Sequence, residues 1–196
     1  MAEDGAAEIE MVVDSVRVHM RTGRHVLVLR EADRGRLLMI WIGVNEANSI
    51  AMKLQGVSPE RPLTHDLMVN LLDAANVRVE RIVITDLEDE TFHARIVVVG
   101  PDARHEVDSR PSDAIALGVR LGSAIYATAD VLDRAATSPD AEEDEEDEGG
   151  DSPKRLSAAT LEETGEPIDA ARLDIFREFV NSLDPDQDPR GGGSSS

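Results

Sequence analysis

The chain has 196 residues, of which 20 are Lys or Arg and 40 are Asp or Glu, giving a formal net charge of −20, and it contains no cysteine. The lack of cysteine excludes a disulfide framework, a zinc site built on cysteines and a cysteine nucleophile. At 41% hydrophobic residues the chain can bury a core. It has no 18-residue apolar run and no apolar stretch in its acidic N-terminus, which argues against a membrane span and a secretory signal, so we expect a cytoplasmic protein.

Three strands are predicted at the start of the chain. Residues 9–18 are rich in Val and partly alternate, and residues 25–31 (HVLVLRE) follow a turn at Gly23. Residues 36–43 (RLLMIWIG) form a continuous apolar run, which predicts burial on both faces and assigns Trp41 to the core.

Helices and strands then follow in groups. Helical spacing of apolar residues begins after Gly43 and ends at Gly56, and a second helix is predicted over residues 64–76. The segments 77–87 and 91–100 read as two strands joined by a tight turn, which makes them an antiparallel pair.

The last predicted elements of the domain are a short strand over 104–110, a helix over 111–121, a strand over 123–128 and a final helical stretch over 129–136. Strands and helices do not alternate strictly. The sequence therefore predicts an α+β domain over residues 1–138, with a mixed, largely antiparallel sheet and three main helices, rather than a doubly wound parallel sheet.

The negative charge is concentrated at the C-terminal end. Residues 1–138 hold 15 basic and 22 acidic residues, a net charge of −7, whereas residues 139–196 hold 5 basic and 18 acidic residues, a net charge of −13. The run 140–151 (DAEEDEEDEGGD) contains nine carboxylates, which repel one another and supply almost no apolar surface. We therefore predict a disordered acidic linker over residues 139–165.

A C-terminal amphipathic helix is predicted over residues 166–184, followed by a flexible tail over 185–196. Pro167 suits the first helical position, and apolar residues recur at helical spacing. They are Ile168, Ala171, Ile175, Phe179 and Leu183. This helix either docks on the domain or binds a protein partner together with the acidic linker.

Two of the predicted helices begin with similar residues. One is entered through R-P-L-T-H-D (61–66) and the other through R-P-S-D (110–113). Each start has Arg-Pro, then a hydroxyl residue, then an Asp. The simplest interpretation is helix capping, with Thr64 and Ser112 as N-caps and the Asp side chains complementing the helix dipole.

The same residues also suit a site for phosphate. Arg61 and Arg110, with the free N–H groups of the helix starts, favour an anion. Asp66 and Asp113 can hold a hard divalent cation or position a water, and His65 can act as a general acid or base. The residues alone leave capping and catalysis both open.

Glu46, just after Gly43, poses the same alternatives: a first-turn charge on its helix or a third carboxylate for a metal. Motifs of other common functional classes are absent from the sequence. The chain has no Walker A, G-x-G-x-x-G or G-x-S-x-G pattern, no zinc spacing among its histidines and no basic stripe interleaved with aromatic residues.

Three segments in order resemble the bacterial bifunctional nuclease domain family. They are MIWIG (39–43) followed by E-A-x-x-I-A (46–51), R-P-L-T-H-D-L (61–67) and D-S-R-P-S-D-A-I-A-L (108–117), and the likeness extends over about residues 9–136. The segment R-x-x-x-F-R-E-F-V (172–180) is similar to the C-terminal part of several members.

The resemblance implies an α+β fold that self-associates and a metal-assisted hydrolysis of phosphodiester bonds in DNA and RNA. Its implied catalytic residues are His65, Asp66 and Asp113. Its implied substrate-binding residues are Arg61, Thr64, Arg110 and Ser112, and its implied ligands for Mg²⁺ or Mn²⁺ are Glu46, Asp66 and Asp113.

The alternative is a non-enzymatic oligomeric binding or regulatory module, in which the Arg-Pro helix starts bind an anion or seal a subunit interface. For either function we expect a homo-oligomer without a membrane partner. A domain charge of −7 lacks the basic footprint of a tight nucleic-acid binder, so contacts with DNA and RNA are expected to be weak and sensitive to salt.

Overall fold

The computed structural model describes residues 7–19, 22–138 and 154–155, all of which lie in the first of the chain's two units, residues 1–161. The predicted linker therefore lies outside the described residues except for 154–155. The predicted C-terminal helix, its candidate partner surface and the tail lie wholly outside them.

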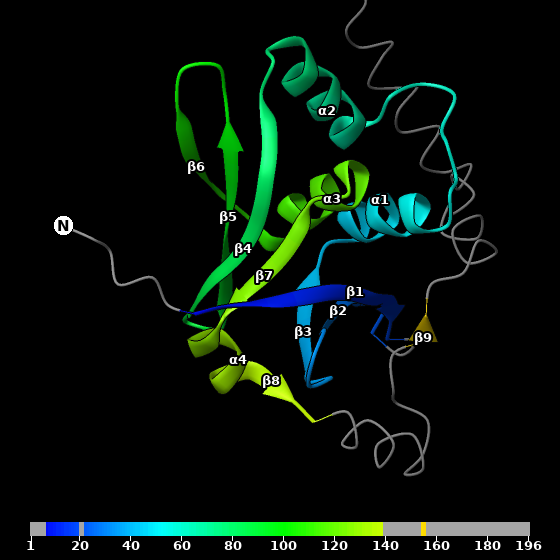
Figure 1. Ribbon diagram of the computed structural model, residues 1–196. Coiled ribbons are helices and arrows are strands. Elements are labelled where there is room, and N and C mark those ends of the chain that lie inside the picture. Colours follow the sequence, from blue (N-terminus) through cyan, green and yellow to red (C-terminus); the bar gives the residue numbers. More distant parts are fainter. Residues whose placement is uncertain (1–6, 20–21, 139–153, 156–196) are drawn as a thin grey trace, which may run out of the picture. The chain divides into compact units, whose positions relative to one another are not determined.

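The strands form one sheet in the order β6-β5-β4-β7-β1-β2-β3-β8, with β9 pairing beside β1 (Figure 1). Neighbouring strands are antiparallel except for β4 and β7, which run parallel. The strands are β1 Glu8–Val18, β2 His25–Glu31, β3 Leu37–Ile42, β4 Arg78–Glu88, β5 Thr91–Val99, β6 Arg104–Ser109, β7 Ala124–Thr128, β8 Ala136–Thr137 and β9 Lys154–Arg155.

Four helices connect these strands: α1 Val44–Leu54, α2 Thr64–Ala74, α3 Pro111–Leu121 and α4 Ala129–Ala135. In Figure 1, α1, α2 and α3 lie beside one another, whereas α4 lies at the far end of β7. No helix in the described part of the chain is long and apolar enough to cross a membrane. The predicted α+β fold with a mixed, largely antiparallel sheet is thus confirmed.

One apolar core joins the sheet to α1 and α3. Ile50 of α1, Ile115 of α3 and Ile82 of β4 are fully buried in it together with Leu27 and Leu38. At Gly118 the backbone of α3 approaches β4 so closely that an added Cβ would lie 2.5 Å from the Ile82 Cδ1. This glycine therefore sets how near α3, and with it the start of α3, lies to the sheet.

The predicted tight turn between β4 and β5 is present. Asp89 and Glu90 both adopt positive φ, at 45° and 62°, as a two-residue type I′ hairpin turn requires. The core assignment of Trp41 is wrong, because its side chain is 49% exposed and the Arg24 guanidinium stacks 4.2 Å from the ring centroid. The attraction between the Arg24 cation and the face of the ring stabilises Trp41 at the surface.

Candidate functional site

The first turns of α1, α2 and α3 meet at one place. His65, the second residue of α2, lies with its Nε2 3.2 Å from Oδ1 of Asp113 in the first turn of α3. These two residues are 48 apart in the sequence, and their contact brings the two Arg-Pro helix starts together. Glu46 in the first turn of α1 joins them through Arg110.

The predicted side-chain caps are wrong. The N-caps of α2 and α3 are Leu63 and Arg110, and neither Thr64 nor Ser112 caps its helix. The extended residue before each helix is Leu63 at α2 and Arg110 at α3, so the N-cap lies one or two positions before the predicted cap residue. At α2, Asp66 takes over part of the capping, since its Oδ2 accepts a hydrogen bond of 3.0 Å from the Leu63 N–H.

His65 is buried and hydrogen bonded at both ring nitrogens. Its side chain is 9% exposed, its Nδ1 lies 2.9 Å from Oγ of Ser49 on α1, and its Nε2 bonds Asp113. Ser49 is itself only 7% exposed. A chain of hydrogen bonds from Ser49 through His65 to Asp113 thus connects the three helices.

Arg110 neutralises two carboxylates of the cluster. Its Nε donates to Oδ2 of Asp113 and its Nη2 donates to Oε1 of Glu46, each at 2.7 Å. These bonds, that to Asp113 first, raise the pKa of the Arg110 guanidinium above its ordinary value. Gly43 leaves room for this arrangement, because a Cβ at that position would collide with the Glu46 carboxylate.

Asp66 has a different set of partners from Asp113. Its Oδ1 accepts a 2.7 Å bond from Nε of Arg120, which also donates to the backbone oxygens of Ala116 and Ser49. The Arg120 side chain is only 6% exposed. Arg120 and the Leu63 N–H hold the pKa of Asp66 below its ordinary value. Oδ1 of Asp66 therefore joins α2 to α3, while its Oδ2 caps α2.

A cavity of about 690 Å³ lies at the meeting point of the helices. It is lined by residues of all three helix starts, namely Asn45, Glu46, Asn48, Ser49, Met52, Pro62, Leu63, Thr64, His65, Arg110 and Asp113. Asn48 brings a buried Oδ1 that has no hydrogen-bond partner in the described structure. The cavity thus offers a base, a hydroxyl, a cation and an unpaired acceptor to a ligand.

Three of the predicted site residues do not line this cavity. Arg61 is exposed beside Pro62, and no described residue forms an ion pair with it. Ser112 is buried in the first turn of α3, and Asp66 lies in its ion pair with Arg120. Glu46, Thr64, His65, Arg110 and Asp113, which the sequence singled out without placing them in space, all line this cavity.

The predicted metal ligands do not form one group. Across residues 7–19, 22–138 and 154–155, no three histidine, aspartate or glutamate side chains are placed to hold a metal ion. Glu46 and Asp113 share Arg110, while Asp66 bonds Arg120. A divalent ion would have to replace Arg110 at the first two carboxylates. The Mg²⁺ or Mn²⁺ site stays a prediction, and the three carboxylates as placed do not fit it.

Sequence reasoning missed Ser49 and Arg120. Ser49 lies in the middle of α1, at an unspecified position of the segment 46–51, and Arg120 lies in the last turn of α3. Their roles depend on how α1, α2 and α3 pack, which no local pattern records. The only available signal is that each lies one or two helical turns from a residue already singled out, Ser49 from Glu46 and Arg120 from Asp113.

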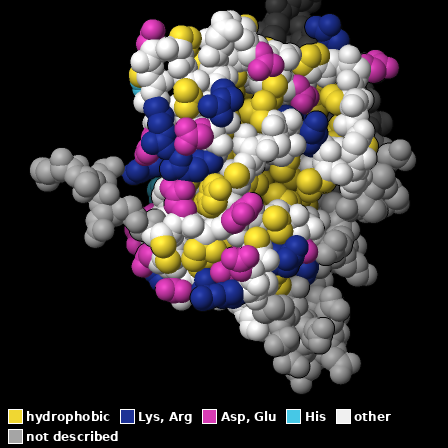
Figure 2. All heavy atoms as spheres, in the orientation of Figure 1, with side chains coloured by type: hydrophobic (Ala, Val, Ile, Leu, Met, Phe, Trp, Pro, Cys, Tyr) yellow, Lys and Arg dark blue, Asp and Glu magenta, His cyan; other side chains and the backbone are white. Residues whose placement is uncertain are grey.

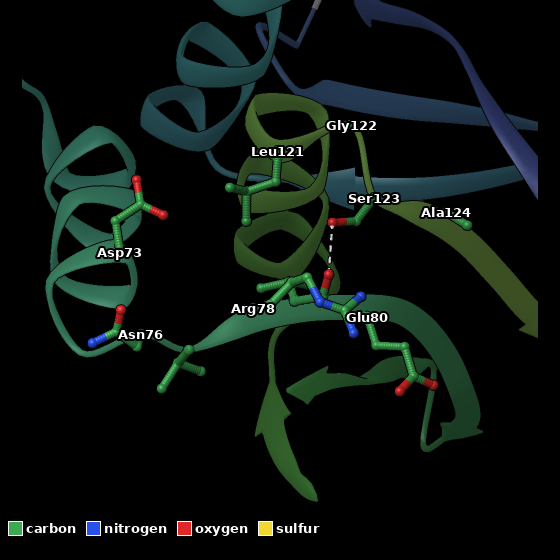
Figure 3. Close-up of a pocket in the computed structure, with 10 residues that line it drawn as sticks. Asp73, Asn76, Arg78, Glu80, Leu121, Gly122, Ser123 and Ala124 are labelled. Carbon is green, nitrogen blue, oxygen red and sulfur yellow. Dashed lines mark hydrogen bonds between the residues drawn. The ribbon is translucent and has the colours of Figure 1, made fainter. Parts of the chain in front are cut away.

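A second cavity, of about 590 Å³, lies at the opposite ends of α2 and α3 (Figure 3). Figure 3 shows Asp73 on the last turn of α2 at one side and Leu121 at the end of α3 at the other. Ser123 donates a 3.4 Å hydrogen bond to the backbone oxygen of Val79 and has no histidine beside it. The lining lacks a paired base and nucleophile, so the first cavity is the candidate site.

Comparison with known proteins identifies the domain in which both cavities lie. The bifunctional nuclease domain matches residues 27–140. The uncharacterized proteins MT1877 and Rv1829 of Mycobacterium tuberculosis strains CDC 1551 / Oshkosh and ATCC 25618 / H37Rv are each 37% identical over 177 residues. The match covers 90% of this chain and 96% of each relative. Every residue lining the candidate site lies inside the matched domain.

Proposed function

Because the chain belongs to the bifunctional nuclease domain family, we propose that it hydrolyses phosphodiester bonds of DNA and RNA in the cavity between α1, α2 and α3. One observation carries the proposal above the others. A buried histidine is oriented by a carboxylate on one ring nitrogen and faces a hydroxyl on the other, in a cavity that also contains an arginine.

Each side chain has a role that follows from its contacts. His65 accepts the proton of the attacking oxygen, and Asp113 holds the ring and stabilises the imidazolium that forms. Arg110 is 66% exposed, and its Nη1 bonds no described residue, so this nitrogen is available to a phosphate oxygen. Thr64 adds a hydroxyl to the lining, and Arg61 contacts a neighbouring phosphate of the substrate.

Mg²⁺ or Mn²⁺ would polarise the phosphate and lower the pKa of an attacking water. The three carboxylates as placed do not fit such an ion, so the proposed reaction uses only the side chains of this protein.

The role of a metal ion is tested by measuring cleavage with added Mg²⁺, with added Mn²⁺ and with a chelator. Cleavage that persists with the chelator supports this reaction, and cleavage that requires the ion restores the predicted metal site.

Contact with nucleic acid is expected to be weak and salt-sensitive. Figure 2 shows acidic and basic side chains interspersed over one face of the molecule, with hydrophobic side chains between them and no extended basic patch on that face. A local pair of arginines then supplies the attraction for phosphate. Each phosphate that the arginines neutralise makes log affinity fall with log salt concentration, with a slope of roughly 0.9 per phosphate on duplex DNA.

The experiment is cleavage of labelled DNA and RNA oligonucleotides by the full chain and by Asp113→Asn. This substitution preserves size but removes the negative charge that stabilises the imidazolium of His65, and we expect at least about 100-fold slower cleavage. Asp133→Asn, at an exposed carboxylate of α4, is the matched control and should cleave like the wild type. Equal cleavage by all three proteins would indicate a contaminating nuclease and contradict the proposal.

Self-association, which the resemblance implies, gains support from α2. Leu63, Leu67 and Leu71 are each exposed by 42% or more and lie four residues apart, so they form one apolar stripe along the helix. We propose that a second copy of the chain covers this stripe. Leu67→Asp should lower the molar mass measured by light scattering, whereas a wild type that is itself monomeric at high concentration would contradict the interface.

A further inference from the structure

The hydrogen bonds of His65 determine where its protons lie. Asp113 accepts a hydrogen bond from Arg110, and a carboxylate can only accept, so the His65 ring donates to it through Nε2. The neutral ring then has a lone pair on Nδ1, 2.9 Å from Oγ of Ser49. Ser49 therefore donates its hydroxyl proton to His65.

This arrangement leaves His65 one route to a substrate. Both ring nitrogens are bonded and the ring is buried, so His65 cannot take a proton from a bound water without losing one of these partners. The hydroxyl of Ser49 is 2.9 Å from Nδ1, and both residues line the cavity. The group whose reactivity His65 raises is thus the serine oxygen itself.

The same three residue types in the same order activate the nucleophile of serine hydrolases, with the two ring nitrogens exchanged. We propose that Ser49 is a catalytic nucleophile that forms a covalent phosphoserine intermediate with the phosphodiester. The substrate class in this inference rests on the proposed function. The reactivity of the serine rests only on the contacts among Ser49, His65 and Asp113.

The chemistry balances without a further reactant. In the first step the Ser49 Oγ forms a bond to phosphorus, the bond from phosphorus to the leaving oxygen breaks, and the hydroxyl proton passes to Nδ1 of His65 and on through water to the leaving oxygen. In the second step water attacks phosphorus, its proton passes to His65, and the Oγ–P bond breaks. The serine oxygen takes that proton back.

Surrounding groups match the charge changes of these steps. Arg110 offers Nη1 to the phosphate oxygens, and Asp113 faces the imidazolium. Arg120 donates a hydrogen bond of 3.3 Å from its Nη2 to the backbone oxygen of Ser49, which fixes this part of α1 against α3.

Ser15 is a comparison residue for Ser49. It is equally buried, but its Oγ bonds the carboxylate of Asp14 and no histidine.

The test is covalent labelling of the full chain with a biotin-tagged fluorophosphonate, read by intact mass and peptide mapping. In labelling, the serine Oγ–P bond forms, the P–F bond breaks, the proton goes to His65 and fluoride leaves. We expect one adduct, on Ser49. Labelling should fall about 100-fold in His65→Gln and disappear in Ser49→Ala, while Ser15→Ala labels like the wild type.

The outcomes separate this inference from the proposed function. Adduct at Ser49 without cleavage of DNA or RNA supports the nucleophile and contradicts the proposed substrate. Cleavage by the wild type without labelling, or undiminished cleavage by Ser49→Ala, overturns the nucleophile and leaves the proposed function standing. Labelling of the wild type that is equal in His65→Gln overturns the inference as well, since activation by the ring is its basis. Labelling and cleavage by the wild-type protein can be judged even if one of the variants fails to fold.

Discussion

The ion pair between Asp66 and Arg120 connects the start of α2 to the last turn of α3. We predict that Asp66→Asn destabilises the protein. The substitution keeps the size of the side chain but removes the negative charge that faces a guanidinium with 6% of its surface exposed. Arg120 then faces a neutral amide in place of the carboxylate, beside the backbone oxygens of Ala116 and Ser49.

The size of the effect follows from these contacts. A hydrogen bond to a charged group contributes roughly 1.5–3 kcal/mol, and leaving its partner buried costs more. Solvent reaches 29% of the Asp66 side chain and screens part of the interaction. We therefore expect a loss of about 2 kcal/mol in the free energy of unfolding, measured by urea denaturation of the full chain followed by circular dichroism.

The matched control is Asp130→Asn in the first turn of α4. Asp130 also bonds an arginine, Arg134, at 3.0 Å, but both side chains are largely exposed, so the loss should stay below about 0.5 kcal/mol. Equal losses in the two variants, or none in Asp66→Asn, would refute the reasoning that burial of Arg120 sets the cost.

The effect should also depend on pH in a defined direction. Arg120 and the Leu63 N–H lower the pKa of Asp66 from 3.8, so the stabilisation is fully present above that value and is lost as the pH falls through the lowered pKa. The difference between wild type and Asp66→Asn should be constant from pH 7 to pH 5 and shrink below pH 3.8. A difference that persists unchanged in acid would contradict this assignment.

Three further predictions concern binding and packing. Arg61→Gln should raise KM for oligonucleotides and reduce the slope of log affinity against log salt by about 1, with kcat unchanged, whereas the exposed Arg34→Gln should do neither. Gly118→Ala should cost about 1–3 kcal/mol of unfolding free energy in urea, because its Cβ forces Ile82 out of place, and an unchanged midpoint would contradict the close approach. Replacing the nine carboxylates of residues 140–151 with amides should raise nucleic-acid affinity at low salt if that run competes for the arginines, and equal affinities would contradict the competition.

The order and type of the elements of the domain could be predicted from the sequence. Apolar periodicity identifies β2 over His25–Glu31 and α3 over Pro111–Leu121 with the bounds that the structure has. These signals are local, since glycine and proline mark the ends of each element. The short strand β8 was not predicted, because two residues carry no periodicity.

The candidate site could be predicted only in part. The repeated Arg-Pro starts identified His65, Arg110 and Asp113, which the structure brings into contact. The same repeat suggested that Asp66 and Asp113 have like roles. They differ because Arg120, seven residues after Asp113, lies on the side of α3 that faces Asp66. Contacts of this kind depend on the relative rotation of packed helices, which a single sequence does not encode locally.

The most direct test of the account compares kcat/KM for oligonucleotide cleavage in His65→Gln and Asp66→Asn, both measured at a temperature where circular dichroism shows each variant folded. In the proposed function His65 is the base, whereas Asp66 holds α2 against α3 through Arg120. This assignment predicts a loss of at least about 100-fold in His65→Gln and a change of less than about threefold in folded Asp66→Asn. A loss in Asp66→Asn as large as that in His65→Gln would contradict it.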